Sequence, residues 1–363
     1  MDGCLFRLIW GLLLLQAPFA LADQVNNEWL SSTRALSMGN VGIASAEDSI
    51  TTMFYNPAAL SRNKKASLEI FNPQIEFGTG FFSLGGNAGG YSKNLALSSI
   101  QPVLREHPHK ASYAGYSLYP NLSAQNFGFG IAWKEQAVSY INSQDKLEYH
   151  SRYLMIPSMG ISMNLLGNRL RIGAAARAIQ ITSNDKVTDA DAPDLGYKKD
   201  PQEGFGLGLD AGAMLSLPWA GLPTLGFVAR NLGDTSFTGS APYPRGEGTA
   251  TAHEKIKMKY DGGIAFFPKL GQRNSLTIAA DYRDLLNVSK VNSLRHLNLG
   301  TEIGYGKSFF FRFGFSQGYL TAGLGLASKF GTFDLGTYGE ELDARNFQEI
   351  QDRRISMRFA VKF

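Results

Sequence analysis

The final stretch of the chain, residues 353–363, constrains the fold more than any other segment. It reads R-R-I-S-M-R-F-A-V-K-F. Successive side chains of a β-strand point to opposite faces, so one face is apolar to the last position: Ile355, Met357, Phe359, Val361 and Phe363. A soluble sheet alternates in the same way, but its last strand rarely stops on an apolar side chain. An apolar-faced strand of about ten residues at this place favours a transmembrane β-barrel.

Alternation and turn residues predict about fourteen strands in all. The clearest alternation lies in 203–216, where Leu207 and Leu209 share one face and Gly208 and Asp210 share the other. The predicted strands are 65–79, 109–119, 125–141, 147–164, 168–183, 203–216, 222–233, 255–267, 274–285, 294–304, 307–315, 318–328, 331–339 and 353–363.

The connections between these strands follow a parity. Every second connection is short: 120–124, 165–167, 217–221, 268–273, 305–306 and 329–330. Most of the others are long: 80–108, 184–202, 234–254 and 340–352. Outer-membrane barrels have short periplasmic turns and longer external loops, whereas an arbitrary series of strands has no reason to follow this rule. The sequence therefore predicts an all-β, antiparallel transmembrane barrel whose last strand ends at the periplasmic side.

The composition agrees with one barrel and excludes one class of function. The chain has 363 residues with 40 Gly, 12% aromatic and 18% charged residues, and no compositional break that would divide it into two domains. Its net charge of +4 is scattered and contains no Lys/Arg cluster of the length that nucleic-acid binding needs. We therefore expect no nucleic-acid partner.

The first 22 residues have the pattern of a cleaved signal peptide. Arg7 precedes the apolar run 8–15, which is too short to span a membrane, and residues 20–22 offer a small-x-small cleavage site. The single cysteine, Cys4, lies before that site, so no thiol chemistry is expected in the mature chain. Export to the outer membrane of a Gram-negative bacterium follows, with outer-membrane lipid and lipopolysaccharide as partners. The barrel-assembly machinery is a further expected partner, because the terminal strand resembles the signal that it reads through Phe359, Val361 and Phe363.

The segment from 27 to 63 does not alternate and is rich in small residues. A helical turn is predicted around 46–54, with Ser45 as its N-cap. Asn56-Pro57 by itself favours a turn before the first strand. The whole segment, however, resembles the N-terminal plug of the FadL family of outer-membrane transporters for hydrophobic compounds. The residues that carry the resemblance are Ala35, Met38, Gly39, Ala44, Ala46, Asp48, Tyr55, Asn56, Pro57, Ala58, Ala59 and Leu60.

This resemblance extends to most of the mature chain and has limits. Ser37, Asn40 and Ala59 depart from the family pattern, and related barrels include PorV-like secretion proteins and barrels annotated among plasmid-transfer proteins. Segments 228–233 and 317–341 also look like segments of PorV-like barrels. The resemblance implies a signal peptide at 1–22, a plug at 23–63 inside the lumen, and a barrel at 64–363. It also implies plug or gating roles for Met38, Gly39, Asp48, Asn56, Pro57 and Ala58.

Charged residues fall on the polar faces of several predicted strands. A charge on the lipid face costs about 2–4 kcal/mol for Arg or Lys at mid-membrane, so we expect these side chains to face the lumen. Either they form ion pairs around the plug, which is the favoured interpretation, or some line a substrate path. The candidate lumen charges are Arg177, Asp210, Asp281, Arg283, Glu302 and Arg312.

The first external connection, 80–108, is a candidate capture site for a hydrophobic ligand. In FadL-like transporters an apolar groove among the outer loops takes up the substrate first. The alternative is that the same side chains only pack the loop onto the rim of the barrel. The apolar residues concerned are Phe81, Phe82, Leu84, Leu95, Leu97 and Ile100.

No catalytic or metal-binding pattern stands out. The five histidines lack metal-ligand spacing, no motif marks a nucleophile, and the Gly-rich 204–210 continues as a strand instead of opening a helix. Asp189, Asp191 and Asp194 depart from a calcium-loop pattern. We expect neither enzymatic activity nor a cofactor or metal.

Three functions remain open at the level of sequence. The first is passive, plug-gated uptake of hydrophobic small molecules such as long-chain fatty acids. The second is a PorV-like, non-conducting barrel that binds a partner of a secretion or conjugation apparatus. A general polar porin is the third, and the plug argues against it.

Overall fold

The computed structural model describes residues 29–84, 104–107, 110–142, 144–189, 201–245, 251–271, 273–342 and 347–363. The predicted signal peptide and most of the 80–108 connection lie outside these described residues. The cleavage of the signal peptide and the role of the 80–108 connection therefore stay predictions. Among the described residues, no helix reaches the length and hydrophobicity that crossing a membrane requires.

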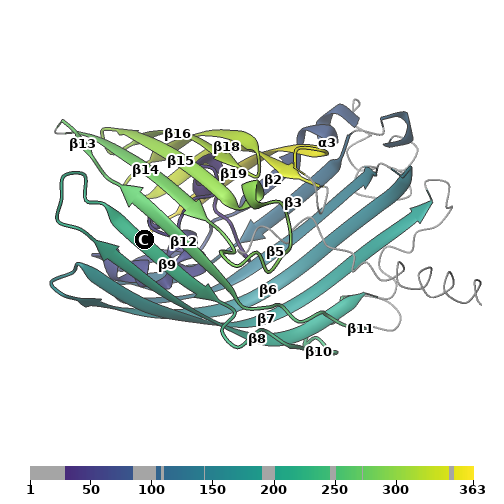
Figure 1. Ribbon diagram of the computed structural model, residues 1–363, viewed down its shortest axis with the longest axis horizontal. Coiled ribbons are helices and arrows are strands. Elements are labelled where there is room, and N and C mark those ends of the chain that lie inside the picture. Colours follow the sequence, from purple (N-terminus) through teal and green to yellow (C-terminus); the bar gives the residue numbers. More distant parts are fainter. Residues whose placement is uncertain are drawn as a thin grey trace, which may run out of the picture.

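The described chain forms a closed antiparallel β-barrel (Figure 1). β1 and β2 together make one wall strand, β3 and β4 make another, and β10, β11 and β13 are short additions, so nineteen segments build fourteen wall strands. The strands are β1 (Ser67–Glu69), β2 (Gln74–Gly78), β3 (Ser112–Leu118), β4 (Asn121–Ala124), β5 (Phe127–Ile141), β6 (Lys146–Leu165), β7 (Leu170–Asp189), β8 (Gln202–Ser216), β9 (Thr224–Arg230), β10 (Phe237–Thr238), β11 (Thr251–Ala252), β12 (Lys259–Phe266), β13 (Lys269–Leu270), β14 (Asn274–Tyr282), β15 (Leu297–Tyr305), β16 (Phe309–Ser316), β17 (Tyr319–Ala327), β18 (Gly331–Glu341) and β19 (Gln351–Val361). The predicted fold class is confirmed.

The terminal strand closes the barrel. In the register of β19 with β2, Ile355 faces Phe77 and Met357 faces Ile75. Beyond β2 the seam continues, because Leu68 and Phe363 exchange two backbone hydrogen bonds of 3.1 and 3.0 Å. The alternation predicted for this strand and for 203–216 holds: Met357 and Leu207 are exposed on the outer face, whereas Arg358 and Asp210 are buried inside.

The first two wall strands differ from the prediction. Strand 65–79 is interrupted between β1 and β2, and the predicted connection 120–124 is mostly strand β4. Pro73 and Pro120 lie at the two breaks, and proline has no N–H for the ladder. The Asn72 side chain bridges the gap: it accepts from the Tyr119 amide at 2.8 Å and donates to the Tyr119 carbonyl.

The wall is taller on one side than on the other. β5 to β8 have 15 to 20 residues each, whereas β14 to β17 have 8 or 9. Figure 1 shows these long strands extending past the shorter ones. The rim with the short turns is the periplasmic side of an outer-membrane barrel, and the tall side extends from the opposite, external rim.

The N-terminal segment lies inside the barrel (Figure 1, purple). It comprises α2 (Thr33–Ser37), η2 (Thr51–Tyr55) and η3 (Pro57–Arg62), while α3 (Thr79–Leu84) and η4 (Ser293–His296) lie in external connections. The turn predicted at 46–54 contains a π-helix whose N-cap is Ile50 and not Ser45. Asp48, just before it, accepts from the Thr51 amide at 2.8 Å. Asn56 caps η3, whose first residue is Pro57, a residue suited to that position.

Candidate functional site: the plugged lumen

Glycines of the wall let the plug backbone touch the strands directly. At ten glycines of the wall an added Cβ atom would lie less than 3.0 Å from a plug atom; two of them, Gly128 of β5 and Gly160 of β6, meet only the side chains of Met53 and Leu60, and the other eight lie in β7 to β18. We call this set of eight the glycine bed: Gly173, Gly212, Gly226, Gly263, Gly300, Gly314, Gly323 and Gly336. Since the set spans β7 to β18, the plug approaches the backbone of many wall strands closely, with no wall side chain in between at these positions.

Met38 and Gly39 occupy one side of this bed. The Met38 carbonyl lies against Gly300, and the Gly39 amide donates to the Thr321 hydroxyl at 2.8 Å. Gly39 has a φ of +65°, and a side chain there would overlap the backbone of Phe315. Glycine is therefore required at 39 both for its backbone conformation and for space.

Asn56, Pro57 and Ala58 occupy the opposite side, against β7 and β8. Asn56 is fully buried, and its Nδ2 donates to the Ile43 carbonyl at 2.7 Å and to the Ala213 carbonyl at 3.3 Å. Its Oδ1 accepts from the Ala58 amide at 3.1 Å. One side chain therefore joins two plug segments and the wall. Asp48 makes a similar link within the plug, because it also accepts from the Ser32 hydroxyl at 2.9 Å.

Three arginines of the wall hold plug carbonyls. Arg177 donates to Met53 at 2.7 Å, and Arg230 donates to Phe54 at 2.6 Å and to Tyr55 at 3.0 Å. Arg283 donates to Asn40 at 2.5 Å. We call these three side chains the arginine clamp. All three are buried.

Aspartates of the same or a neighbouring strand lie beside the clamp arginines. Asp210 pairs with Arg177 at 2.5 Å, and Asp261 pairs with Arg230. Asp281 lies 3.7 Å from Arg283 and accepts from the amides of Gly42 and Ile43 at 2.7 and 3.0 Å. These wall charges therefore fix the plug backbone.

A second chain of charges continues across the next strands. Glu302 receives Arg34 of the plug in a bidentate pair at 2.9 Å and Arg312 at 2.6 Å. Arg312 in turn donates to Asp334 at 2.6 Å. All six lumen charges proposed from the sequence thus lie inside the barrel and take part in one of the two networks.

Asp334 also stands on the polar face of a predicted strand, 331–339, whereas sequence reasoning missed three other members of these networks: Arg34, Arg230 and Asp261. Asp261 stood on the inward face of a predicted strand, between Lys259 and Gly263, and parity alone would have identified it. Arg230 lay in the predicted strand 222–233 as well, but it was noted there only as part of the segment 228–233 that resembles PorV-like barrels. Arg34 had no signal, because an irregular segment offers no periodicity from which to place a side chain.

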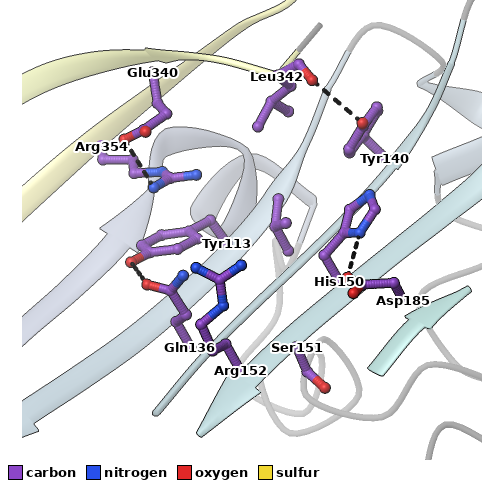
Figure 2. Close-up of a pocket in the computed structure, with 11 residues that line it drawn as sticks. Tyr113, Gln136, Tyr140, His150, Ser151, Arg152, Asp185, Glu340, Leu342 and Arg354 are labelled. Atoms are coloured by element: carbon purple, nitrogen blue, oxygen red, sulfur yellow. Dashed lines mark hydrogen bonds and ion pairs between the residues drawn. The ribbon is translucent and has the colours of Figure 1, made fainter. Parts of the chain in front are cut away.

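Above the plug, two adjoining cavities of about 50 and 20 Å³ form a vestibule on the external side. Tyr113, Gln136, Glu340 and Arg354 line both cavities, while Leu30 and Leu36 of the plug and Gln74 and Lys134 of the wall are among the residues lining the smaller one. Figure 2 shows Arg354 lying against the Tyr113 ring and reaching Glu340; the distances are 3.5 Å to the ring centroid and 3.1 Å to the carboxylate. His150 and Asp185 form the far wall, with Nδ1 2.8 Å from the carboxylate. The vestibule ends on the plug.

The vestibule holds only small molecules in this conformation. A cavity that accepts benzene measures about 150 Å³ in other proteins, and one water needs roughly 10–15 Å³. The larger cavity is therefore large enough for a few waters and too small for a monoaromatic ring.

The predicted capture loop is only partly described. Phe81, in α3, is buried, and its ring centroid lies 5.1 Å from that of Phe77. This contact is what simple packing onto the rim requires. Phe82 and Leu84 fall in the same helix. Leu95, Leu97 and Ile100 lie outside the described residues, so the capture surface stays a prediction.

Phe359, Val361 and Phe363 of the predicted assembly signal lie on the last strand and just beyond it, and both phenylalanines are exposed. Within the described ranges, no group of three or more His, Cys, Asp and Glu side chains is placed to hold a metal ion. Of the acidic trio considered for calcium, Asp191 and Asp194 fall outside those ranges.

The geometry defines a class: a closed, fourteen-stranded β-barrel of the outer-membrane type whose lumen is filled by its own N-terminal segment. No protein-family model matches the chain, and no curated protein matches it. Solved structures do match. The toluene transporter TodX of Pseudomonas putida aligns with a TM-score of 0.54 and 11% identity over 93% of this chain and 98% of its own.

The toluene transporter TbuX of Ralstonia pickettii gives a TM-score of 0.53 and 14% identity over 93% and 98% of the two chains. CymD, described as a monoaromatic hydrocarbon channel, gives 0.53 and 11% over 92% and 97%. The FadL-like barrel predicted from the plug motif is thus confirmed at the level of fold. These structural neighbours are transport channels and not enzymes.

Proposed function

We propose that this protein mediates passive, plug-gated uptake of hydrophobic small molecules across the outer membrane. The carrying observation is a vestibule that opens to the external side and ends on plug residues such as Leu30, inside a barrel with the fold of hydrocarbon channels. In the resting state the plug blocks the end of the vestibule. A cargo molecule can therefore cross the barrel only after the plug has moved. Export through a cleaved signal peptide at 1–22 completes the proposal.

The cargo class is hydrophobic or amphiphilic, and long-chain fatty acids are the proposed example. Monoaromatic hydrocarbons, which the neighbours' descriptions name, are the second candidate cargo. The apolar residues of the first external loop would gather either compound at the mouth. The cargo would then contact the polar vestibule only while the plug is open.

A specific observation favours the alternative of a non-conducting, partner-binding barrel. The glycine bed and the arginine clamp hold the plug against many wall strands. A plug fixed in this way suits a barrel whose role is to present its loops to a partner of a secretion apparatus. The two functions differ in one measurable respect, which is whether the plug must move.

A reversible cross-link between plug and wall tests this difference. A Cβ atom at position 336 would lie 3.2 Å from Cβ of Ser37, close to the 3.5–4.5 Å of disulfides. The sequence has a single cysteine, Cys4, inside the predicted signal peptide, so a Ser37→Cys/Gly336→Cys pair should form one unambiguous disulfide. Uptake of radiolabelled oleate and toluene would be measured in cells that express the oxidised or the reduced pair.

If the plug moves as a whole, oxidation abolishes transport and a reductant restores it in the same protein. Transport that is equal in both states, yet above that of cells without the protein, would contradict movement of the whole plug and restrict gating to the release of a segment that the cross-link does not hold. If neither state exceeds those cells, and a protein partner co-purifies, the partner-binding function replaces the proposal.

A further inference from the structure

The periplasmic rim carries a one-sided charge. Seven of its described cations are exposed, and none of them belongs to an ion pair within the described residues: Lys64, Lys65, Arg169, Lys269, Arg273, Lys307 and Lys329. The six short turns of this rim contain no Asp or Glu. In the part of the rim that the structure describes, Glu47 of the plug is the one exposed acidic side chain.

Exposed apolar side chains alternate with these cations. Leu166 precedes Arg169, and Leu270 follows Lys269. Similarly, Tyr305 precedes Lys307 on the next turn. The last turn is the clearest case, because the Lys329 ammonium lies 5.5 Å from the centroid of the Phe330 ring, which is 71% exposed. Four separate turns therefore pair a cation with an apolar group.

The described part of the external rim lacks this bias. There the exposed cations Lys146 and Lys257 occur beside exposed acids such as Asp145 and Glu254. Among the described residues, the excess of positive charge is thus found on one rim, and it does not follow from the modest net charge of the chain, +4.

We propose that the periplasmic rim binds the headgroups of anionic phospholipids in the inner leaflet of the outer membrane. A lysine or arginine near an anionic membrane surface attracts its phosphates, and apolar or aromatic side chains prefer the same interfacial depth. The paired turns supply both groups at once.

The distribution of the cations favours a lipid over an acidic protein. They lie at the base of β1, between β6 and β7, between β12 and β14, between β15 and β16, and between β17 and β18. These five positions are distributed around the circumference of the closed sheet. A protein partner would cover one contiguous patch, whereas an annulus of lipid meets every turn. This inference does not depend on the proposed uptake function.

Native mass spectrometry of the full chain tests the proposal. The protein is released from micelles that contain equal amounts of phosphatidylglycerol and phosphatidylcholine, and the ratio of the two bound lipids is counted. A rim triple variant, Lys269→Gln/Lys307→Gln/Lys329→Gln, is compared with a matched triple on the external rim, Lys146→Gln/Lys257→Gln/Lys290→Gln. Both remove three exposed lysines and the same net charge.

We expect the wild type and the external triple to retain phosphatidylglycerol preferentially, and the rim triple to lose about tenfold of that preference, since each interfacial lysine contributes appreciably to the attraction. Replacing the same three rim lysines by arginine should keep the preference, which separates charge from any loss of fold. Equal retention of the two lipids by the wild type, or equal loss in both glutamine triples, would overturn the proposal. In the first case an acidic protein would become the candidate partner.

Discussion

A substitution at Asn56 gives the most direct test of how the plug is held in the barrel. Asn56→Asp is the smallest change that removes the hydrogen bonds donated by this side chain. Aspartate has the same shape and keeps the oxygen that accepts from the Ala58 amide. It lacks the two N–H donors that now reach the carbonyls of Ile43 and Ala213. The substitution therefore removes the link between plug segments and wall while leaving the volume unchanged.

The size of the effect follows from burial. Asn56 is 0% exposed, and a buried acceptor that loses its partner costs about 1–3 kcal/mol. With two carbonyls affected, we expect a local loss of about 2–4 kcal/mol. Because 1.4 kcal/mol is a factor of ten, the open form of the segment around Ala58 should become at least roughly 30 times more populated.

Two measurements on one preparation check this expectation. Amide hydrogen exchange at Ala58 should accelerate by that factor, and uptake of labelled oleate or toluene should rise with it if plug opening limits transport. Asn63→Asp is the matched control, since Asn63 lies just after η3, is only half-buried, and has no described side-chain hydrogen bond. Unchanged exchange in a folded Asn56→Asp barrel would refute the role given to Asn56. Faster exchange with unchanged uptake would instead separate plug opening from function and favour partner binding.

Four further outcomes follow from the structure. Gly314→Ala should lower the urea midpoint of unfolding by the equivalent of about 1–3 kcal/mol, because its Cβ would overlap the plug backbone, whereas Gly262→Ala, whose Cβ would make only an ordinary 3.6 Å contact with Leu285, should not. Arg230→Met should cost about 3–5 kcal/mol in the same assay by leaving a buried aspartate and two plug carbonyls without their donor; an unchanged midpoint would remove the clamp as a stabilising element. Phe363→Ala should reduce the amount of barrel in the outer membrane of cells but not its refolding into detergent, since this exposed ring lies outside the core and belongs to the predicted assembly signal. Burial alone would raise the pKa of Asp284, but hydrogen bonds from Ser289 hold that pKa below its ordinary value; its loop should therefore keep its protected amides above the ordinary aspartate pKa and lose them as the pH falls through the lowered value, which hydrogen exchange at pH 5 and pH 3 would show.

Most of the barrel was predictable because the same alternation of apolar and polar side chains recurs in every strand of the wall. In a strand that separates lipid from a polar lumen, apolar and polar side chains must alternate. The positions of Leu207 and Asp210 in the sequence therefore predict which of them faces lipid and which faces the lumen. The breaks near Pro73 and Pro120 were harder, since they depend on a side-chain bridge from Asn72 to another strand. Such a bridge has no local pattern.

The site was predictable in its residues but not in its connections. Parity placed Arg177 and Asp210 in the lumen, and the structure shows which plug carbonyl the arginine holds. That partner lies 124 positions away in the sequence. The plug itself was identified by resemblance alone, because irregular backbone that fits against glycines leaves no periodic trace.

The arrangement of the clamp limits where the plug can open. Expelling the whole plug would separate three buried arginines from their carbonyls at once, at a cost of several kcal/mol for each. The clamp contacts lie between Asn40 and Tyr55 and stop there. The following residues, from Asn56 to the end of η3, are capped by the Asn56 side chain and lie beside the periplasmic turn at Asn126, whose amide donates to the Leu60 carbonyl at 3.3 Å. We therefore infer that gating, if uptake is the function, is a local release of this last segment while the clamped part of the plug stays in place.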